Sequence, residues 1–252
     1  MKIFNPLEQF EIEEILSFST IFGSISITNS AFYIFIAILI FIISSNELLK
    51  KKSSIELIGN KNIIISESIY NTILSMVKDQ IGNKNEIYLP FIFVLFNFIL
   101  FINLIGLIPY SFTATSHFAL TLSLSIAIII GTTILGFEKH KIKFFSVFIP
   151  SGTPLGLVPL LVIIEFLSYL ARALSLGIRL GANLLAGHSL LKILSTFTWK
   201  FISTNFISTI IGIIPIILIT LLMGMEIGIG ILQAMVFCIL TCSYIRDSIN
   251  LH

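Results

Sequence analysis

Charged residues are scarce in this sequence, since Asp, Glu, Lys and Arg together make up only 11% of its 252 residues. A soluble domain carries about a quarter charged residues. Here 56% of the residues are hydrophobic and the mean hydropathy is +1.04. This composition excludes an ordinary soluble protein. It predicts a polytopic membrane protein in which no separate soluble domain is long enough to recognise.

Cysteines and nucleotide-binding motifs are also scarce or missing. The two cysteines, Cys238 and Cys242, lie four residues apart in an apolar segment. A zinc or haem site would need further ligands close by, and none are there. We therefore expect two small buried side chains, no metal and no cofactor. The phosphate-cradling pattern GxxxxGK[ST] is missing as well, so we expect no nucleotide site on this chain.

Long apolar runs take the place of charge. Segments 28–46, 88–109 and 116–137 each suit one membrane-crossing helix, which needs about 20 residues. Segments 158–198 and 203–249 are much longer, so each is either a hairpin of two spans or one strongly tilted helix. The first of them contains no turn signal beyond isolated glycines, and we therefore favour tilted helices. Pro215 is a candidate for a kink in the second.

Segment 62–81 differs from these spans. Ile65, Ile69, Ile73 and Val77 recur at helical spacing, while charged residues occupy other faces. This pattern is typical of an amphipathic helix on the membrane surface. The predicted fold class is therefore all-α, with about five membrane helices, the last two long and strongly tilted, and one amphipathic surface helix.

Two basic clusters indicate the topology, because positive charge is enriched on the cytoplasm-equivalent side of a membrane protein. The clusters are Lys50–Lys52 and the segment from Lys139 to Lys143, and two crossings separate them. The N-terminus is therefore expected outside and the C-terminus inside, after Arg246. The acidic segment 5–20 is expected to be solvated or interfacial.

Arg179 lies inside one of the apolar runs, within the sequence SLGIRLGANLLAGHSLL. An arginine at the bilayer centre costs about 2.5–3.5 kcal/mol even on the mildest insertion scale. A charge retained there normally faces a water-filled cavity or an opposite charge. The surrounding small residues allow another helix to approach closely. These residues are Gly177, Gly181, Ala182, Ala186 and Gly187.

Other polar residues share these long segments. Glu165, Arg172 and Arg179 are spaced seven apart, so they drift only slightly around one helix face. Glu226 and Gln233 are also seven apart. Protonatable residues inside spans usually mark proton relays.

Depth in the membrane divides these residues into two groups, one reachable from each surface. By the topology above, Glu165 and Asp247 are near the inner side, His188 is towards the outer side and Glu226 is at intermediate depth. A continuous chain would short-circuit a proton gradient, whereas two offset half-channels would not.

Structural roles are the alternatives for several of these residues. The pair Glu165–Arg172 could be a local ion pair that only stabilises packing, and His188 alone could be a satisfied interfacial histidine. Asn103 and Asn183 could join helices through hydrogen bonds. Glu226, in the middle of an apolar run, is harder to explain by structure alone, and we favour a functional role for it.

The sequence resembles a known family. The stretches YLARALSLGIRLGANLLAGHSLL, PSGTPLGLVPLLVIIEFLSY, INLIGLIPYSF and YIRDSINLH are similar to subunit a, also called subunit 6, of the mitochondrial F-type ATP synthase. The likeness runs from NPLEQFEI at 5–12 to the C-terminus. In that family, the arginine matching Arg179 faces the carboxylates of the rotating c-subunit ring. The resemblance implies an outer half-channel and an inner half-channel. The outer group is Asn103, Asn183, His188, Glu226 and Gln233; the inner group is Glu165 and Asp247, with Arg172 in support.

The resemblance implies a proton-conducting stator subunit that couples proton flow to ring rotation in ATP synthesis. Partner subunits would catalyse that synthesis, so this chain is not expected to be an enzyme. The implied partners are the c-ring, the peripheral stalk, other membrane subunits, lipid and the transported proton, with no nucleic acid. The implied location is the mitochondrial inner membrane, multi-pass, with the N-terminus in the intermembrane space and the C-terminus in the matrix.

A self-contained proton-coupled transporter or a respiratory-chain membrane subunit is the alternative. A transporter would usually show two related halves, but the short early spans and the long late ones do not match. A haem-carrying subunit would need paired axial histidines on its spans, and the four histidines present do not supply them.

Overall fold

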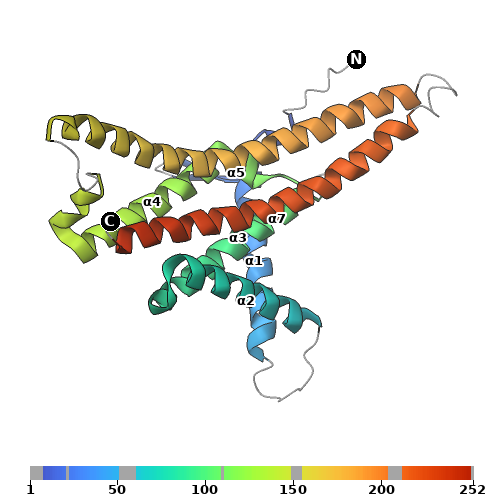
Figure 1. The fold of residues 1–252 in the computed structure, drawn as a ribbon. Coiled ribbons are helices and arrows are strands. Elements are labelled where there is room, and N and C mark those ends of the chain that lie inside the picture. The colour runs from blue at the N-terminus through green and yellow to red at the C-terminus, as the bar shows by residue number, and fades with distance from the viewer. Residues whose placement is uncertain are drawn as a thin grey trace. The chain divides into compact units, whose positions relative to one another are not determined.

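The computed structural model describes residues 8–20, 23–50, 61–108, 111–148, 155–203 and 212–250. Most of these residues are helical, which confirms the predicted all-α class (Figure 1). The α-helices are α1 (Asn29–Lys50), α2 (Lys61–Ile81), α3 (Leu89–Gly106), α4 (Phe118–His140), α5 (Val158–Ile202) and α7 (Ile213–Ile249). The short 3-10 helices are η1 (Glu8–Phe10), η3 (Asn83–Tyr88), η4 (Ala114–Ser116), η5 (Lys141–Phe148) and η6 (Leu155–Leu157).

Among the described residues, four helices are long and apolar enough to cross a membrane: Asn85–Gly106, Phe118–Ser146, Val158–Ile202 and Ile213–Ile249. The segment Asn29–Ser45 of α1 forms a shorter apolar helix. The polytopic membrane class is therefore confirmed. Of the first basic cluster, Lys51 and Lys52 lie outside the described residues.

Helices α5 and α7 are each one continuous helix, of 45 and 37 residues, rather than hairpins of two spans. At a rise of 1.5 Å per residue they are about 67 Å and about 55 Å long. A bilayer core is about 30 Å thick, so helices of this length either tilt strongly or extend beyond it. The kink expected at Pro215 is wrong, because this residue lies in the first turn of α7, where no intrahelical hydrogen bond is lost. Residues 204–211 of the predicted helix are outside the described residues.

Backbone conformation explains where α4 stops. Lys141 follows its last residue, His140, with a φ of 49°. This left-handed conformation is a common way to end a helix. It turns the chain into η5, which carries Lys141 and Lys143 of the second basic cluster.

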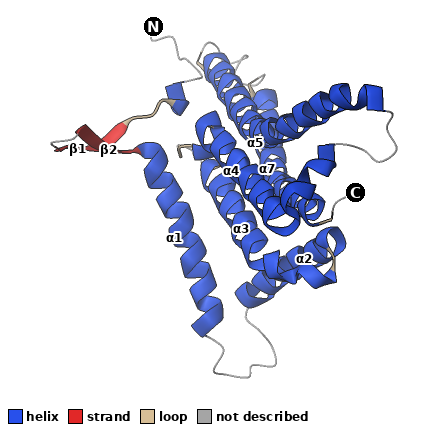
Figure 2. Cartoon of the chain, turned by 90° about the vertical axis from the view of Figure 1, so that its left-hand side faces the viewer, coloured by secondary structure: helices blue, strands red, loops and turns tan. Residues whose placement is uncertain are grey.

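The N-terminal region contains a structure that the sequence analysis did not predict. Strand β1 (Glu14–Thr20) pairs antiparallel with β2 (Gly23–Thr28) to form a two-stranded sheet immediately before α1 (Figure 2). The expectation of a merely solvated or interfacial segment over 5–20 was therefore incomplete. Apolar and polar residues alternate along 24–27, the period of a strand, and this signal could have identified the hairpin.

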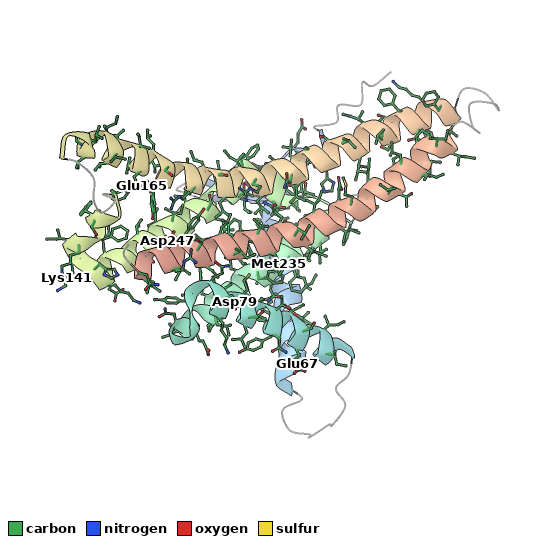
Figure 3. All side chains as sticks on the ribbon, viewed as in Figure 1. Glu67, Asp79, Lys141, Glu165, Met235 and Asp247 are labelled. Atoms are coloured by element: carbon green, nitrogen blue, oxygen red, sulfur yellow. The ribbon has the colours of Figure 1, made fainter. Side chains whose placement is uncertain are left out.

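Helix α2 carries the apolar stripe that the sequence analysis described, and part of that stripe is covered within the protein. Ile73 and Val77 are buried, whereas Ile65 is 59% exposed. Glu67 and Asp79 are exposed on the same helix (Figure 3). At the N-terminal end of α2 the stripe is exposed, and Ile64 is exposed there as well; the location of this helix on the membrane surface stays a prediction.

The chain forms two compact units. The first comprises Met1–Ile42, Phe98–His117 and Leu180–Gln233. Its core includes Ile99 from α3 and Leu180 from α5, both almost fully buried.

The second unit comprises Ile43–Asn97, Phe118–Arg179 and Ala234–His252. Its core includes Ile92, Leu176 and Phe237, and it also buries Cys238 and Cys242 completely. The two cysteines are free and buried, as expected from their apolar surroundings.

Candidate functional site

All five residues of the outer group lie in the first unit. Two interhelical contacts connect the three helices that carry them. Asn183 on α5 donates through Nδ2 to Oε1 of Gln233 on α7, at 3.3 Å. Asn103 on α3 donates through Nδ2 to the carbonyl oxygen of Gly230 on α7, at 3.2 Å. The two asparagines therefore do join helices, as the structural alternative proposed, and they do so next to the titratable members of the group.

Several polar atoms of the outer group are buried without a partner. Asn103 is completely buried, and Glu226 and Gln233 are each 7% exposed. Among the described residues, no hydrogen-bond partner is present for Asn103 Oδ1, His188 Nε2 or Glu226 Oε2. An unpaired buried polar group costs about 1–3 kcal/mol, which bridging water would relieve. The arrangement is therefore suited to a hydrated path.

A glycine gives Glu226 its place against α5. A Cβ built on Gly187 would lie well inside van der Waals contact with Glu226 Oε1 and 3.0 Å from its Cδ. Glu226 therefore lies directly against the residue that precedes His188. The sequence analysis treated Gly187 only as a small residue that allows another helix to approach closely. Its contact with the carboxylate of Glu226 appears only in the structure.

The inner group, Glu165 and Asp247, lies in the second unit (Figure 3). Arg172 contacts both carboxylates. Its guanidinium lies 3.4 Å from Glu165 Oε1 and 3.9 Å from Asp247 Oδ2. Arg246 Nε adds a contact of 3.7 Å with Asp247 Oδ1. The i, i+7 pair Glu165–Arg172 therefore exists, but it belongs to a wider cluster that also reaches α7.

A small cavity of about 160 Å³ adjoins these charges. Three polar residues that the sequence analysis missed contribute to its wall: Tyr169, Tyr244 and Ser248. Tyr169 follows Glu165 by four residues and Tyr244 precedes Asp247 by three, so helical spacing could have identified both. The cavity is large enough for several water molecules.

Arg179 is the last residue of its α5 segment in the second unit, and it is exposed. Its guanidinium donates to Ser175 Oγ at 3.4 Å. None of the carboxylates that the structure describes forms an ion pair with it. Nearby, Gly177 contacts α4 so closely that a Cβ would lie 2.8 Å from the carbonyl oxygen of Thr121. The predicted close approach of a helix at this glycine is thus satisfied within the chain, while the charge of Arg179 remains available.

Metal ligands do not gather in these groups. Within the described ranges, no three His, Cys, Asp or Glu side chains cluster as a metal site would require. The chemistry of both groups is instead that of hydrogen-bonding and titratable side chains, which is suited to the movement of protons.

Comparison with known proteins gives a consistent result. A model of the family described as "ATP synthase A chain" matches residues 30–246. The chain is 52% identical to ATP synthase subunit a of Trichophyton rubrum over 253 residues, covering 99% of this chain and 98% of that protein. It is 47% identical to ATP synthase subunit a of Saccharomyces cerevisiae over 252 residues, covering 99% and 97%. It is 44% identical to the subunit from Chondrus crispus over 250 residues, covering 99% and 98%.

Proposed function

This chain belongs to the ATP synthase A chain family, and on that premise we propose that its outer and inner groups are two offset half-channels separated by Arg179. The chain is the proton-translocating membrane subunit of an F-type ATP synthase and is not itself catalytic. ATP synthesis takes place on partner subunits. This membership sets aside the alternatives of a self-contained transporter and of a respiratory-chain subunit.

The outer half-channel uses the residues of the first unit. A proton taken up from the outer side passes along water-linked groups to His188 and Glu226, then reaches a carboxylate of the c-ring. The unpartnered buried atoms of Asn103, His188 and Glu226 support this reading, because water molecules are needed to satisfy them. Gln233 and Asn183, paired with each other, hold α5 and α7 together beside the path.

The inner half-channel uses the second unit. A proton released by the ring leaves past Glu165 and Asp247, beside the small cavity that both residues line. Arg172 supports this exit by holding the two carboxylates around one cation. Tyr169 and Tyr244 add hydroxyl groups that can donate and accept hydrogen bonds with water in this cavity.

Arg179 carries the proposal. It is an exposed cation within a largely apolar part of α5, and the carboxylates described in this chain do not pair with it. A charge of this kind inside a membrane requires a counter-charge, which the ring carboxylate supplies in its deprotonated form. The cation favours that form and promotes proton release. It also repels a proton crossing directly from one half-channel to the other.

The topology that we propose rests on the two basic clusters. We place the chain in the mitochondrial inner membrane with crossings at 28–46, 88–109, 116–137, 158–198 and 203–249, and with the helix 62–81 on the matrix surface. The N-terminus lies in the intermembrane space and the C-terminus in the matrix. Partners are the c-ring, the peripheral stalk and other membrane subunits of the complex.

The test replaces Arg179 with Ala or Lys in the assembled complex. Passive proton flux is measured in vesicles stripped of the catalytic head, and ATP synthesis is measured with the head attached. Arg179→Ala should abolish synthesis and open a leak. Arg179→Lys keeps a cation but loses the planar fork of donors, so it should be severely impaired with less leak. Lys200→Ala, on the same helix, is the control. Normal synthesis by Arg179→Ala would refute the central role of this charge.

A further inference from the structure

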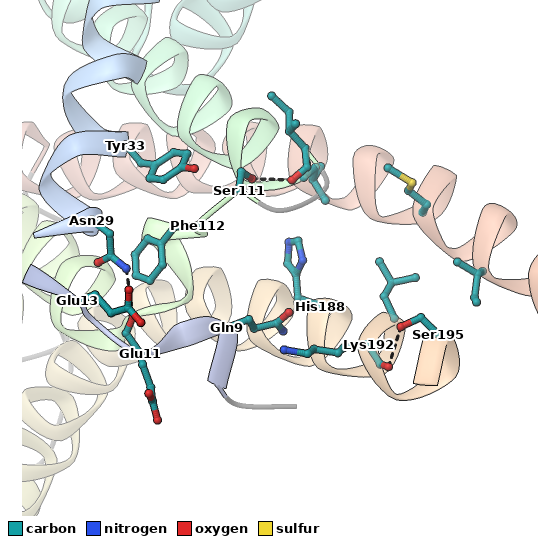
Figure 4. A pocket seen from close by; sticks show the side chains of 15 residues that line it. Gln9, Glu11, Glu13, Asn29, Tyr33, Ser111, Phe112, His188, Lys192 and Ser195 are labelled. Atoms are coloured by element: carbon teal, nitrogen blue, oxygen red, sulfur yellow. Dashed lines mark hydrogen bonds between the residues drawn. The ribbon is translucent and has the colours of Figure 1, made fainter. Parts of the chain in front are cut away.

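A cavity of about 690 Å³ lies in the first unit and is not used above (Figure 4). Its wall combines the N-terminal segment, the start of α1, the segment that follows α3 and parts of α5 and α7. His188, a member of the outer group, is part of this wall. The other polar side chains that line the cavity are Gln9, Glu11, Glu13, Asn29, Tyr33, Ser111, Lys192 and Ser195.

Hydrogen bonds to backbone atoms hold the N-terminal segment beside this cavity. Asn29, the first residue of α1, donates from its backbone N–H to the carbonyl oxygen of Glu13 and from Nδ2 to that of Glu11, both at 3.1 Å. Phe10 is 9% exposed, and its backbone hydrogen-bonds His117. These contacts leave the carboxylates of Glu11 and Glu13 free to face water, and both residues are exposed.

The opposite wall comes from α5. His188 and Lys192 are four residues apart and therefore lie on one face of that helix. Figure 4 shows the ring of His188 pointing into the space, and Gln9 and Lys192 also line it. Within the described residues, His188 Nε2 and Gln9 Nε2 are buried atoms without a hydrogen-bond partner. Water in the cavity would satisfy both atoms.

The charges on the wall have a clear balance. The formal charges of the acidic and basic side chains, two carboxylates (Glu11 and Glu13) and one ammonium (Lys192), add up to −1. Without the carboxylates it would be +1, because Lys192 would stand alone. A cleft lined by one sign of charge raises the local concentration of the opposite ion. Glu11 and Glu13 therefore reverse a field that would otherwise repel protons from His188.

We propose that this cavity is the mouth of the outer half-channel and that Glu11 and Glu13 are its proton-collecting residues. The inference rests on the proposed function of His188 and Glu226. It adds residues from a part of the chain where sequence analysis predicted only a solvated or interfacial segment. It also assigns a role to the N-terminal hairpin, because the hairpin brings Glu13 next to the first residue of α1.

The test is the double variant Glu11→Gln/Glu13→Gln in the assembled complex. Proton flux from the outer side is measured in vesicles without the catalytic head, at about 10 mM and about 150 mM salt. The Debye lengths are about 30 Å and about 8 Å at these two concentrations. Flux at low salt should fall about tenfold, the low end of the range for electrostatic steering, and the deficit should shrink at high salt.

Three variants make the result decisive. Glu14→Gln removes the same charge from the next residue, which does not line the cavity, and should have no effect. Glu11→Asp/Glu13→Asp keeps both charges and should retain the flux. Lys192→Gln should raise the low-salt flux. Equal flux in the double variant and in Glu14→Gln at low salt would overturn the inference.

Glu226→Gln separates this inference from the proposed function. If it blocks flux while the double variant behaves like wild type, only the proton-collecting role fails. If Glu226→Gln itself leaves flux unchanged in a fully assembled complex, the outer half-channel is wrong and the inference fails with it. Native gels establish assembly for every variant, and the backbone nature of the ties at Asn29 predicts that assembly is preserved.

Discussion

Replacing Gly187 with Ala tests whether the position of Glu226 matters for proton transfer. The added Cβ would stand 3.0 Å from Glu226 Cδ and 3.3 Å from its Cγ, and closer still to Oε1. Ordinary contact begins at 3.4 Å, so the carboxyl carbon must retreat by about 0.4 Å and the oxygen by more. Because the clashing atoms are the far end of a flexible side chain, the carboxylate moves and the helices stay packed.

The expected effect is on rate rather than on assembly. Overpacking usually costs about 1–3 kcal/mol, and a clash at the tip of a flexible side chain belongs at the low end of that range. A misplacement of about 1 Å can reduce a reaction rate about a hundredfold. For a displacement of roughly half that size we expect ATP synthesis to fall about three- to tenfold.

The assay is ATP synthesis in energised vesicles, normalised to the amount of complex on a native gel. Gly131→Ala is the matched control, because an added Cβ there meets no atom within 4 Å and the residue lies on α4. The variant Glu226→Asp shortens the side chain by one methylene and should be impaired on its own. Combined with Gly187→Ala it should be less impaired than the two separate losses predict, since the clash is relieved.

Two results would refute this reasoning. If Gly187→Ala synthesises ATP like Gly131→Ala, the placement of Glu226 against α5 is irrelevant to proton transfer. If Gly187→Ala instead prevents assembly of the complex, the glycine is needed for helix packing and not for the position of the Glu226 carboxylate.

Three further predictions concern the second unit. Gly177→Ala should reduce the yield of assembled complex several-fold relative to Gly131→Ala on native gels, because its Cβ would meet not only the Oγ of Ser125 but also the backbone of α4 at Thr121 and Leu122, which cannot move aside as a side chain can; equal yields would contradict this packing. Asp247→Cys should react with a polar thiol reagent added to the inner side only, and labelling from the outer side alone would reverse the topology. The native cysteines should stay silent in that experiment because both are fully buried. Arg172→Gln should slow proton release to the inner side several-fold. Arg172→Lys should slow it less, since the lysine retains a cation between Glu165 and Asp247. Slower release in Arg172→Lys than in Arg172→Gln would contradict this role of the charge.

Structure and sequence agree best where the physics is local. Hydropathy over about 20 residues is enough to identify a membrane helix. The continuity of α5 and α7 likewise follows from the absence of turn signals and is confirmed. Scarcity of charge made Arg179, Glu165 and Glu226 conspicuous, because a charged side chain in such a run needs an explanation.

Local patterns did not show which apolar residues other parts of the chain cover. The spacing predicted the apolar stripe of α2, and the structure shows that Ile73 and Val77 are buried within the protein whereas Ile65 is exposed. The hairpin β1–β2 was missed because the acidic residues around Glu11 and Glu14 outweighed the short alternating pattern at 24–27.

By itself, then, the sequence determined the membrane class, the helices, the central arginine and the titratable residues worth considering, because hydropathy, periodicity and the cost of a charge in lipid are properties of short segments. Only the tertiary structure decided which of these residues meet. Asn183 pairs with Gln233 across 50 residues of sequence, and Arg172 reaches Asp247 on another helix. Gly187 leaves room for the side chain of Glu226, and the N-terminal segment forms one wall of a polar cavity. Such contacts depend on the crossing and register of helices distant in sequence, and no short segment encodes them.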